Sequence, residues 1–243
     1  YTVQYAGEEA PSSPMKFTFE GENFKLEDGS IAELPSGLDR KGYNFGGWSY
    51  NGEVYTTLAE LFKETTLGDG NDASTTEIDL TAVWKVNTYT ITYVLNGGTL
   101  NEGYKESYTV VDETFALETP ADRTGYKFRG WFEEEDFSGS AVSQILAGST
   151  GNKVFYAKWE AIQYTVAFNA NGGEGSLDAQ TFTYDVAKEL TNNNSSIHRT
   201  GYTFLGWATE KDSNSVAYSD GASVINLAST NNETVKLFAV WQI

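Results

Sequence analysis

Hydrophobic and polar residues alternate with a period of two in three separate segments of the chain. Aromatic and β-branched residues occupy one face of each segment, at Tyr1, Val3 and Tyr5, at Tyr89, Ile91 and Tyr93, and at Tyr164, Val166 and Phe168. This pattern predicts β-strands. Asn-Gly-Gly follows the second and third segments, at 96–98 and 171–173, and supplies the positive φ angles that a tight hairpin turn needs. We expect return strands over 16–20, 107–111 and 180–184.

A second apolar pattern, Gly-Tyr-x-Phe-x-Gly-Trp, occurs three times, at 42–48, 125–131 and 201–207. Tyr and Phe lie two residues apart and share a face, whereas the Trp lies three residues beyond the Phe and points the other way in an unbroken strand. A glycine inside a strand often marks a bulge, and one extra residue restores the phase. We therefore predict that Trp48, Trp131 and Trp207 reach the core through a bulge.

Each copy of this motif is followed by a short segment with apolar residues three and four apart, at 58–63, 141–146 and 222–227, which predicts one or two helical turns. An alternating strand then ends in a second Trp, at Trp84, Trp159 and Trp241. Each unit thus comprises about four strands and one short helix. The predicted class is mainly β or α+β.

This threefold similarity divides the chain into three repeats, which we place at 1–86, 87–161 and 162–243. Only four residues separate the last strand of one repeat from the first strand of the next, and these linkers, 85–88 and 160–163, contain no Gly, Ser or Pro. Four extended residues span about 13 Å at most. Neighbouring repeats must then nearly touch, and we expect a stiff, elongated, monomeric rod.

Composition restricts the classes of partner. The net charge of −18 argues against binding to nucleic acid, whose phosphates require Lys and Arg. The longest apolar run is too short for a transmembrane helix, so we expect no membrane insertion. With no Cys, disulfides are excluded, and 35 aromatic residues must supply the cores. Residue 1 already belongs to a strand pattern, which indicates either a removed signal peptide or a fragment.

Candidate chemistry is sparse. With one His, His198, which we expect at the surface, and no Cys, we predict no catalytic residue, cofactor or metal centre. Asp69-Gly70-Asn71-Asp72 departs from EF-hand spacing, although irregular Ca²⁺ coordination stays open.

Two groups of residues could contact a partner. One is the acidic run Glu133, Glu134, Glu135 and Asp136, which is present in the second repeat alone and could hold Ca²⁺ or a basic partner, or could simply be a solvated loop. The other comprises tyrosines outside the repeated core positions, namely Tyr50, Tyr55, Tyr104 and Tyr218. Exposed tyrosines could contact a glycan or a protein.

The order of an opening strand with Asn-Gly-Gly, then Arg-Thr-Gly-Tyr-x-Phe-x-Gly-Trp at 123–131, then Tyr156-Ala157-Lys158-Trp159 resembles the Listeria/Bacteroides repeat, the B-repeat of internalin-type surface proteins. The resemblance covers nearly the whole chain, although the first repeat lacks Asn-Gly-Gly and has Lys41 in place of Thr. It implies β-grasp-like modules, in which the first and last strands are adjacent and parallel, in a secreted or cell-surface bacterial protein. The implied role is non-catalytic, as a spacer or adhesin that binds a host or cell-wall protein or glycan. The alternative is a carbohydrate-binding or other ligand-binding array that uses exposed Tyr and acidic loops.

Overall fold

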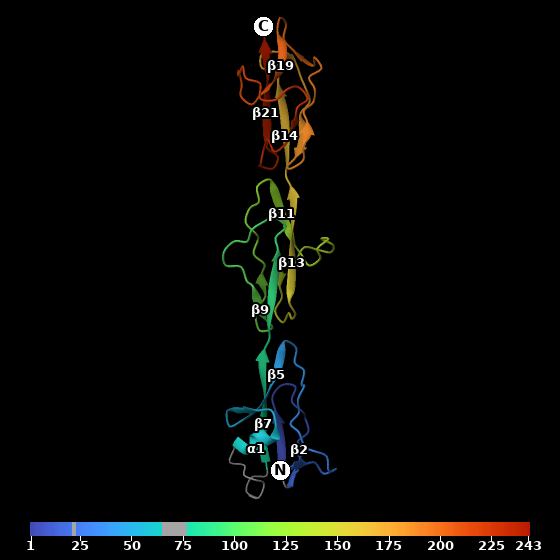
Figure 1. Cartoon of the computed structure of the whole chain (residues 1–243), viewed down its shortest axis with the longest axis vertical. Helices are drawn as coiled ribbons and strands as arrows, with labels where there is room; N and C mark the ends of the chain where they lie inside the picture. Colours follow the sequence, from blue (N-terminus) through green and yellow to red (C-terminus); the bar gives the residue numbers. More distant parts are fainter. Residues whose placement is uncertain (21–22, 65–76) are drawn as a thin grey trace. The chain divides into compact units, whose positions relative to one another are not determined.

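The computed structural model describes residues 1–20, 23–64 and 77–243. Spatial contacts group the chain into two compact units. The first comprises Tyr1–Thr92, Lys105–Ala116 and Gln144–Lys153, and the second comprises Tyr93–Tyr104, Leu117–Ser143 and Val154–Ile243. The second repeat thus contributes segments to both units. As predicted, strands predominate in both (Figure 1).

The first unit contains the sheet of the first repeat, whose strands lie in the order β2-β1-β7-β5-β6. The elements of this repeat are β1 (Thr2–Ala6), β2 (Met15–Lys16), β3 (Thr18–Glu20), β4 (Asn23–Lys25), β5 (Tyr43–Tyr50), β6 (Glu53–Tyr55), α1 (Leu58–Glu64) and β7 (Glu77–Val86). Strands β1 and β7 are parallel, with Val3 opposite Ile78. The first and last strands of this repeat are therefore adjacent and parallel, as the resemblance implies.

The second unit contains the sheet of the third repeat, in the corresponding order β16-β14-β21-β19. The elements of this repeat are β14 (Gln163–Asn169), β15 (Glu174–Gly175), β16 (Gln180–Thr183), β17 (Lys188–Glu189), β18 (Ile197–His198), β19 (Thr203–Ala208), β20 (Ser223–Val224) and β21 (Thr234–Gln242). Strands β14 and β21 run side by side and parallel, with Val166 opposite Val235 (Figure 1).

The second repeat forms β8 (Thr88–Val94), β9 (Ser107–Thr109), β10 (Phe115–Ala116), β11 (Tyr126–Phe132), β12 (Gln144–Ile145) and β13 (Lys153–Ala161). Strand β8 pairs with β9, β10 with β12, and β11 with β13, all antiparallel. The repeat boundaries expected after residues 86 and 161 lie where β7 gives way to β8 and where β13 gives way to β14.

The predicted bulge is present in all three repeats. The register of the central strand shifts between Phe45 and Gly47, and it shifts in the same way at 128/130 and 204/206. The tryptophan that follows each bulge is buried: Trp48, Trp131 and Trp207 are 0%, 2% and 0% exposed. The second set is different, because Trp84, Trp159 and Trp241 are only half-buried.

Aromatic rings fill the cores, as the absence of Cys led us to expect. In the first repeat, Trp48 packs against Tyr5 and Phe45, with ring centroids 4.7 Å and 5.4 Å away. In the third repeat, Trp207 packs in the same way against Phe168 and Phe204, at 4.8 Å and 5.0 Å. Each buried tryptophan thus anchors the core of its own repeat.

The prediction of one helix in each repeat is wrong. The first repeat has α1, which begins after Thr57, whose hydroxyl accepts the Glu60 N–H at 3.1 Å, and the Glu60 carboxylate reaches back to the Thr56 N–H at 3.2 Å. The first bond satisfies an amide that the helix leaves free, and the second holds the residues that lead into the helix. The corresponding segments of the other repeats instead pair as β12 and β20. They lack the Thr-x-x-Glu cap and are rich in β-branched residues, so sheet pairing is favoured.

The Asn-Gly-Gly segments form the expected positive-φ turns but not tight hairpins. In the second repeat Asn96 and Gly97 have φ angles of 47° and 89°, and the Gly98 N–H bonds to the Leu95 carbonyl at 2.9 Å. Pairing with the return strand, however, begins only at Thr90 and Ser107. A long loop therefore separates the turn from the return strand. Contacts other than strand pairing hold the turn in place.

Candidate functional site

An arginine stacks on the tyrosine of the Gly-Tyr-x-Phe motif in every repeat. The guanidinium carbon of Arg123 lies 3.7 Å from the centroid of the Tyr126 ring and 5.9 Å from that of Trp159. Arg40 repeats this arrangement in the first repeat, and Arg199 lies 3.9 Å from Tyr202 in the third. Cation–π attraction of this kind orients the guanidinium. The sequence carried the signal, since Arg precedes the Tyr by three residues in all copies.

In the second repeat this arginine is also bonded to the Asn-Gly-Gly turn. Its Nη1 donates to the Asn96 carbonyl at 2.9 Å, while the Asn96 side-chain amide donates to the Ala157 carbonyl at 2.9 Å. The indole N–H of Trp159 donates to the Leu95 carbonyl, also at 2.9 Å. The turn, the arginine and the half-buried tryptophan thus form one cluster, which fixes the start of the long loop.

A surface depression of about 390 Å³ adjoins this cluster, and we call it the second-repeat depression. Asn96, Arg123 and Trp159 line it, together with Glu135 and Phe137 from the loop after β11. Glu135 belongs to the acidic run selected from the sequence, whereas Phe137 was not anticipated. Phe137 has a φ of 60°, which is unusual for a bulky residue, and its ring lies 5.7 Å from Phe132.

The other residues of the acidic run play different parts. Glu133 and Glu134 are exposed. The Asp136 carboxylate accepts the Ser138 N–H at 2.8 Å, and hydrogen bonds from Ser138 lower the pKa of Asp136. Among the described residues, no group of three or more His, Asp or Glu side chains could hold a metal ion. The possible Ca²⁺ loop at 69–72 lies outside the described residues.

The four tyrosines selected from the sequence are less exposed than expected. Tyr55 is 8% exposed and belongs to the core of the first repeat, so its expected exposure is wrong. Tyr50 and Tyr218 are half-buried against the cores of the first and third repeats. Tyr104 is also half-buried, edge-on to Tyr93 at 5.7 Å. They do not form an exposed aromatic platform.

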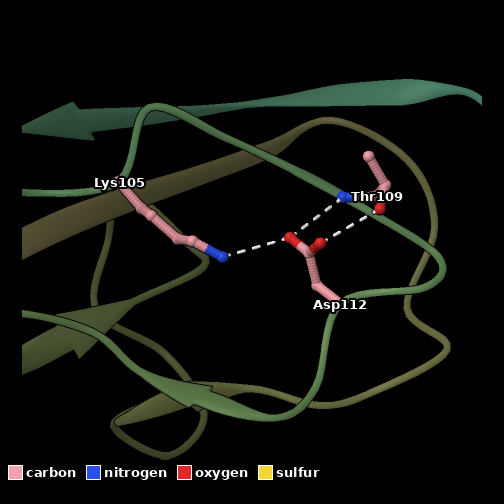
Figure 2. Close-up of polar contacts among 3 residues, drawn as sticks. All are labelled: Lys105, Thr109 and Asp112. Carbon is pink, nitrogen blue, oxygen red and sulfur yellow. Dashed lines mark hydrogen bonds and ion pairs between the residues drawn. The ribbon is translucent and has the colours of Figure 1, made fainter.

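A further cluster of polar side chains stabilises a turn in the second repeat. Figure 2 shows the Asp112 carboxylate accepting the Thr109 N–H at 3.3 Å, the Thr109 hydroxyl at 3.1 Å and the Lys105 ammonium at 3.1 Å. The hydrogen bond from Lys105, followed by those from Thr109, lowers the pKa of Asp112. Because all three donor groups of Lys105 and Thr109 stabilise the ionised carboxylate, Asp112 is suited to hold the turn rather than to exchange protons.

His198, the one histidine, lies at the surface as expected. Its side chain is 58% exposed, and its Nε2 is 3.8 Å from a Glu174 carboxylate oxygen on the paired strand. An exposed pair of this kind contributes little to stability.

Comparisons with known proteins agree with the repeat architecture. The Listeria-Bacteroides repeat domain family matches residues 1–71, 89–158 and 164–239, and the chain belongs to this family as three tandem copies. It is 28% identical over 226 residues, 89% of its length, to an Evansella cellulosilytica protein named "Putative membrane protein". A second protein of that organism, named "Putative Gly-rich membrane protein", is 30% identical over 182 residues, 70% of this chain. The chain spans 30% and 18% of the lengths of these two relatives. No helix among the described residues is long and apolar enough to cross a membrane.

Proposed function

We propose that this chain is a non-catalytic segment of a bacterial surface protein that acts as a stiff, monomeric spacer. The observation that carries the proposal is the length of the links between repeats. One residue, Asn87, separates β7 from β8, and one residue, Ile162, separates β13 from β14. A link of one residue leaves few backbone torsions about which adjoining repeats could bend.

The link after the second repeat is also bonded on both sides. The Ile162 N–H donates to the Gly125 carbonyl at 2.9 Å, and the Ile162 carbonyl accepts the Tyr184 N–H at 3.0 Å. Ile162 is 4% exposed, and the Tyr126 and Tyr184 rings meet edge to face at 5.9 Å. The linking residue is therefore packed and hydrogen-bonded, unlike a flexible tether.

The link after the first repeat uses the same backbone bond. The Asn87 N–H donates to the Gly42 carbonyl at 2.9 Å, and Gly42 occupies the motif position that Gly125 occupies in the second repeat. A β-carbon on Gly42 would lie 2.5 Å from Cβ of Val110 in the next repeat. This close approach requires glycine, which supports a specific contact at this link as well.

A surface location is supported by the family and by the names of the two relatives, both of which refer to the membrane. The charge of −18 favours solubility and mutual repulsion between copies on a crowded surface.

Stiffness can be tested by spin labelling, because the absence of Cys allows two labelled cysteines to be introduced cleanly. We place them at the exposed residues Lys127 and Thr181, on β11 and β16. Pulsed electron paramagnetic resonance should give a narrow distance distribution, and inserting Gly-Ser-Gly-Ser after Ile162 should broaden it. A distribution equally broad in both proteins would refute the spacer proposal. Light scattering on the same samples tests the monomeric state.

A further inference from the structure

The second-repeat depression differs from the corresponding place in the third repeat. There, the side-chain oxygen of Asn171 accepts the backbone N–H of Asp212 at 3.3 Å, which joins the Asn-Gly-Gly turn to the loop after β19. In the described part of the second repeat, no such bond joins Asn96 to the loop after β11, and the depression lies between them. Among the described residues, the turn and this loop are thus hydrogen-bonded to each other in the third repeat but not in the second.

The depression is lined by a positively charged donor and a negatively charged acceptor, and both can form hydrogen bonds with a ligand. Stacking on Tyr126 and the bond to Asn96 hold the Arg123 guanidinium, but that bond uses one of its five N–H donors. Glu135 is exposed, and no ion pair joins it to Arg123 in the described residues. A fixed donor and an acceptor therefore line the same space without neutralising each other.

Aromatic surface completes the site. The Trp159 indole is half-buried and held by its bond to Leu95, while Phe137 is half-buried beside Phe132. Both rings line the depression. Small-molecule sites combine apolar walls with a few orienting polar groups in volumes from about 300 Å³ upward. The second-repeat depression is more polar than this, with three polar and three apolar residues in its lining, and its volume is sufficient for one ring-sized ligand.

We propose that the second-repeat depression binds a neutral pyranose residue of a glycan. A pyranose presents a C–H face that packs on aromatic rings, and its hydroxyls both donate and accept hydrogen bonds. They could donate to Glu135 and accept from Arg123. A phosphate or sulfate would face the Glu135 carboxylate and the net charge of −18, whereas a lysine side chain would face the Arg123 guanidinium.

The site can be tested on the whole chain with an array of neutral hexose and N-acetylhexosamine oligosaccharides. A saccharide retained on the array is then titrated into ¹⁵N-labelled protein while the six indole N–H signals are observed. We expect the Trp159 signal to shift and the Trp84 and Trp241 signals to stay in place. Glu135→Gln should weaken binding about tenfold, the effect of losing a hydrogen bond to a charged group.

Glu134→Gln is the matched control, because Glu134 is exposed one residue away but does not line the depression. It should bind as the unmodified protein does. Phe137→Leu, which keeps apolar volume but removes the ring, should also weaken binding.

Three results would overturn the proposal: no retained saccharide, equal effects of the two glutamate substitutions, or a lysine-containing peptide shifting the Trp159 signal where saccharides do not. The inference is independent of the spacer role, since distance distributions between repeats and saccharide binding can fail separately.

Discussion

The indole N–H of Trp131 donates a hydrogen bond to the backbone carbonyl of Glu118 at 2.9 Å. Trp48 makes the equivalent bond to the Pro35 carbonyl at 2.8 Å. Trp207 is buried to the same degree, yet its Nε1 has no hydrogen-bond partner among the described residues. Two copies of the core tryptophan therefore make an indole hydrogen bond that the third copy lacks. Comparing the repeats shows how much this bond contributes to stability.

This difference predicts unequal effects of the same substitution. Trp131→Phe and Trp207→Phe both remove buried ring volume, but Trp131→Phe also leaves the Glu118 carbonyl without its donor. We expect Trp131→Phe to destabilise its repeat by about 1 kcal/mol more than Trp207→Phe destabilises the third. Native-state hydrogen exchange at amides of β13 and β21 measures the two repeats separately. Equal losses of protection in the two repeats would contradict a stabilising contribution from the Trp131 indole hydrogen bond.

Glycine at the start of the Gly-Tyr-x-Phe motif predicts a second comparison. Gly42, Gly125 and Gly201 all have positive φ, but a β-carbon would lie 2.5 Å from Val110 at the first and 2.2 Å from the Tyr184 ring at the second. A β-carbon at Gly201 would have no atom of the described residues within 4 Å, apart from its neighbours in the chain. Alanine at 201 should therefore cost only the left-handed backbone strain, about 1–2 kcal/mol.

Alanine at 42 or 125 should destabilise the folded protein by more than alanine at 201 does. It should also loosen the link to the next repeat. Faster hydrogen exchange at the Asn87 and Ile162 amides, which bond to these glycines, would report the loosening. Unchanged exchange at both amides would show that the close approach does not hold the links.

The cap of α1 predicts a local effect. Thr57→Ala removes the hydroxyl that accepts the Glu60 N–H and should destabilise the helix by about 1 kcal/mol. Thr57→Ser keeps the oxygen and serves as the control. Hydrogen exchange in 58–64 should accelerate in the alanine variant alone. Equal acceleration in both variants would assign the effect to the lost methyl group.

Much of the fold could be predicted because its signals are local and occur three times. Alternation identified β1, β8 and β14, and the extra glycine identified the bulge that buries Trp131. The helix failed as a repeated element because segments 141–146 and 222–227 have the apolar spacing but pair with neighbouring strands. The spacing of apolar residues alone does not show whether a segment forms a helix or pairs with a strand.

The candidate site was harder to predict because it depends on contacts between distant segments. Glu135 was selected from the sequence, but its proximity to Asn96 and Trp159 depends on how the loop after β11 folds. Tyr55 was selected for lying outside the repeated pattern and is nonetheless buried. It pairs with Trp48 as Tyr218 pairs with Trp207, but the spacing along the chain differs between the two repeats, so the sequence pattern did not show this correspondence.

Asp185 connects the second repeat to the third and predicts a pH dependence of the link. Its carboxylate accepts the Asn226 side-chain amide and the Tyr126 hydroxyl, each at 2.7 Å. These hydrogen bonds, Asn226 first, lower the pKa of Asp185 below its ordinary 3.8. A lowered pKa means that the bonds stabilise the folded protein fully above pH 3.8 and that this contribution is lost as the pH falls through the lowered value.

The distance distribution between labels at 127 and 181 should therefore stay narrow at neutral pH and broaden once the pH falls well below 3.8. Tyr126→Phe should broaden it already at neutral pH, since Asp185 then loses its bond to the second repeat. Asp185→Asn should reduce the broadening at acid pH, because an amide does not titrate. If the distribution of Asp185→Asn broadens at acid pH as much as that of the unmodified protein, other carboxylates must cause the broadening. The acid sensitivity of the link then does not arise at Asp185.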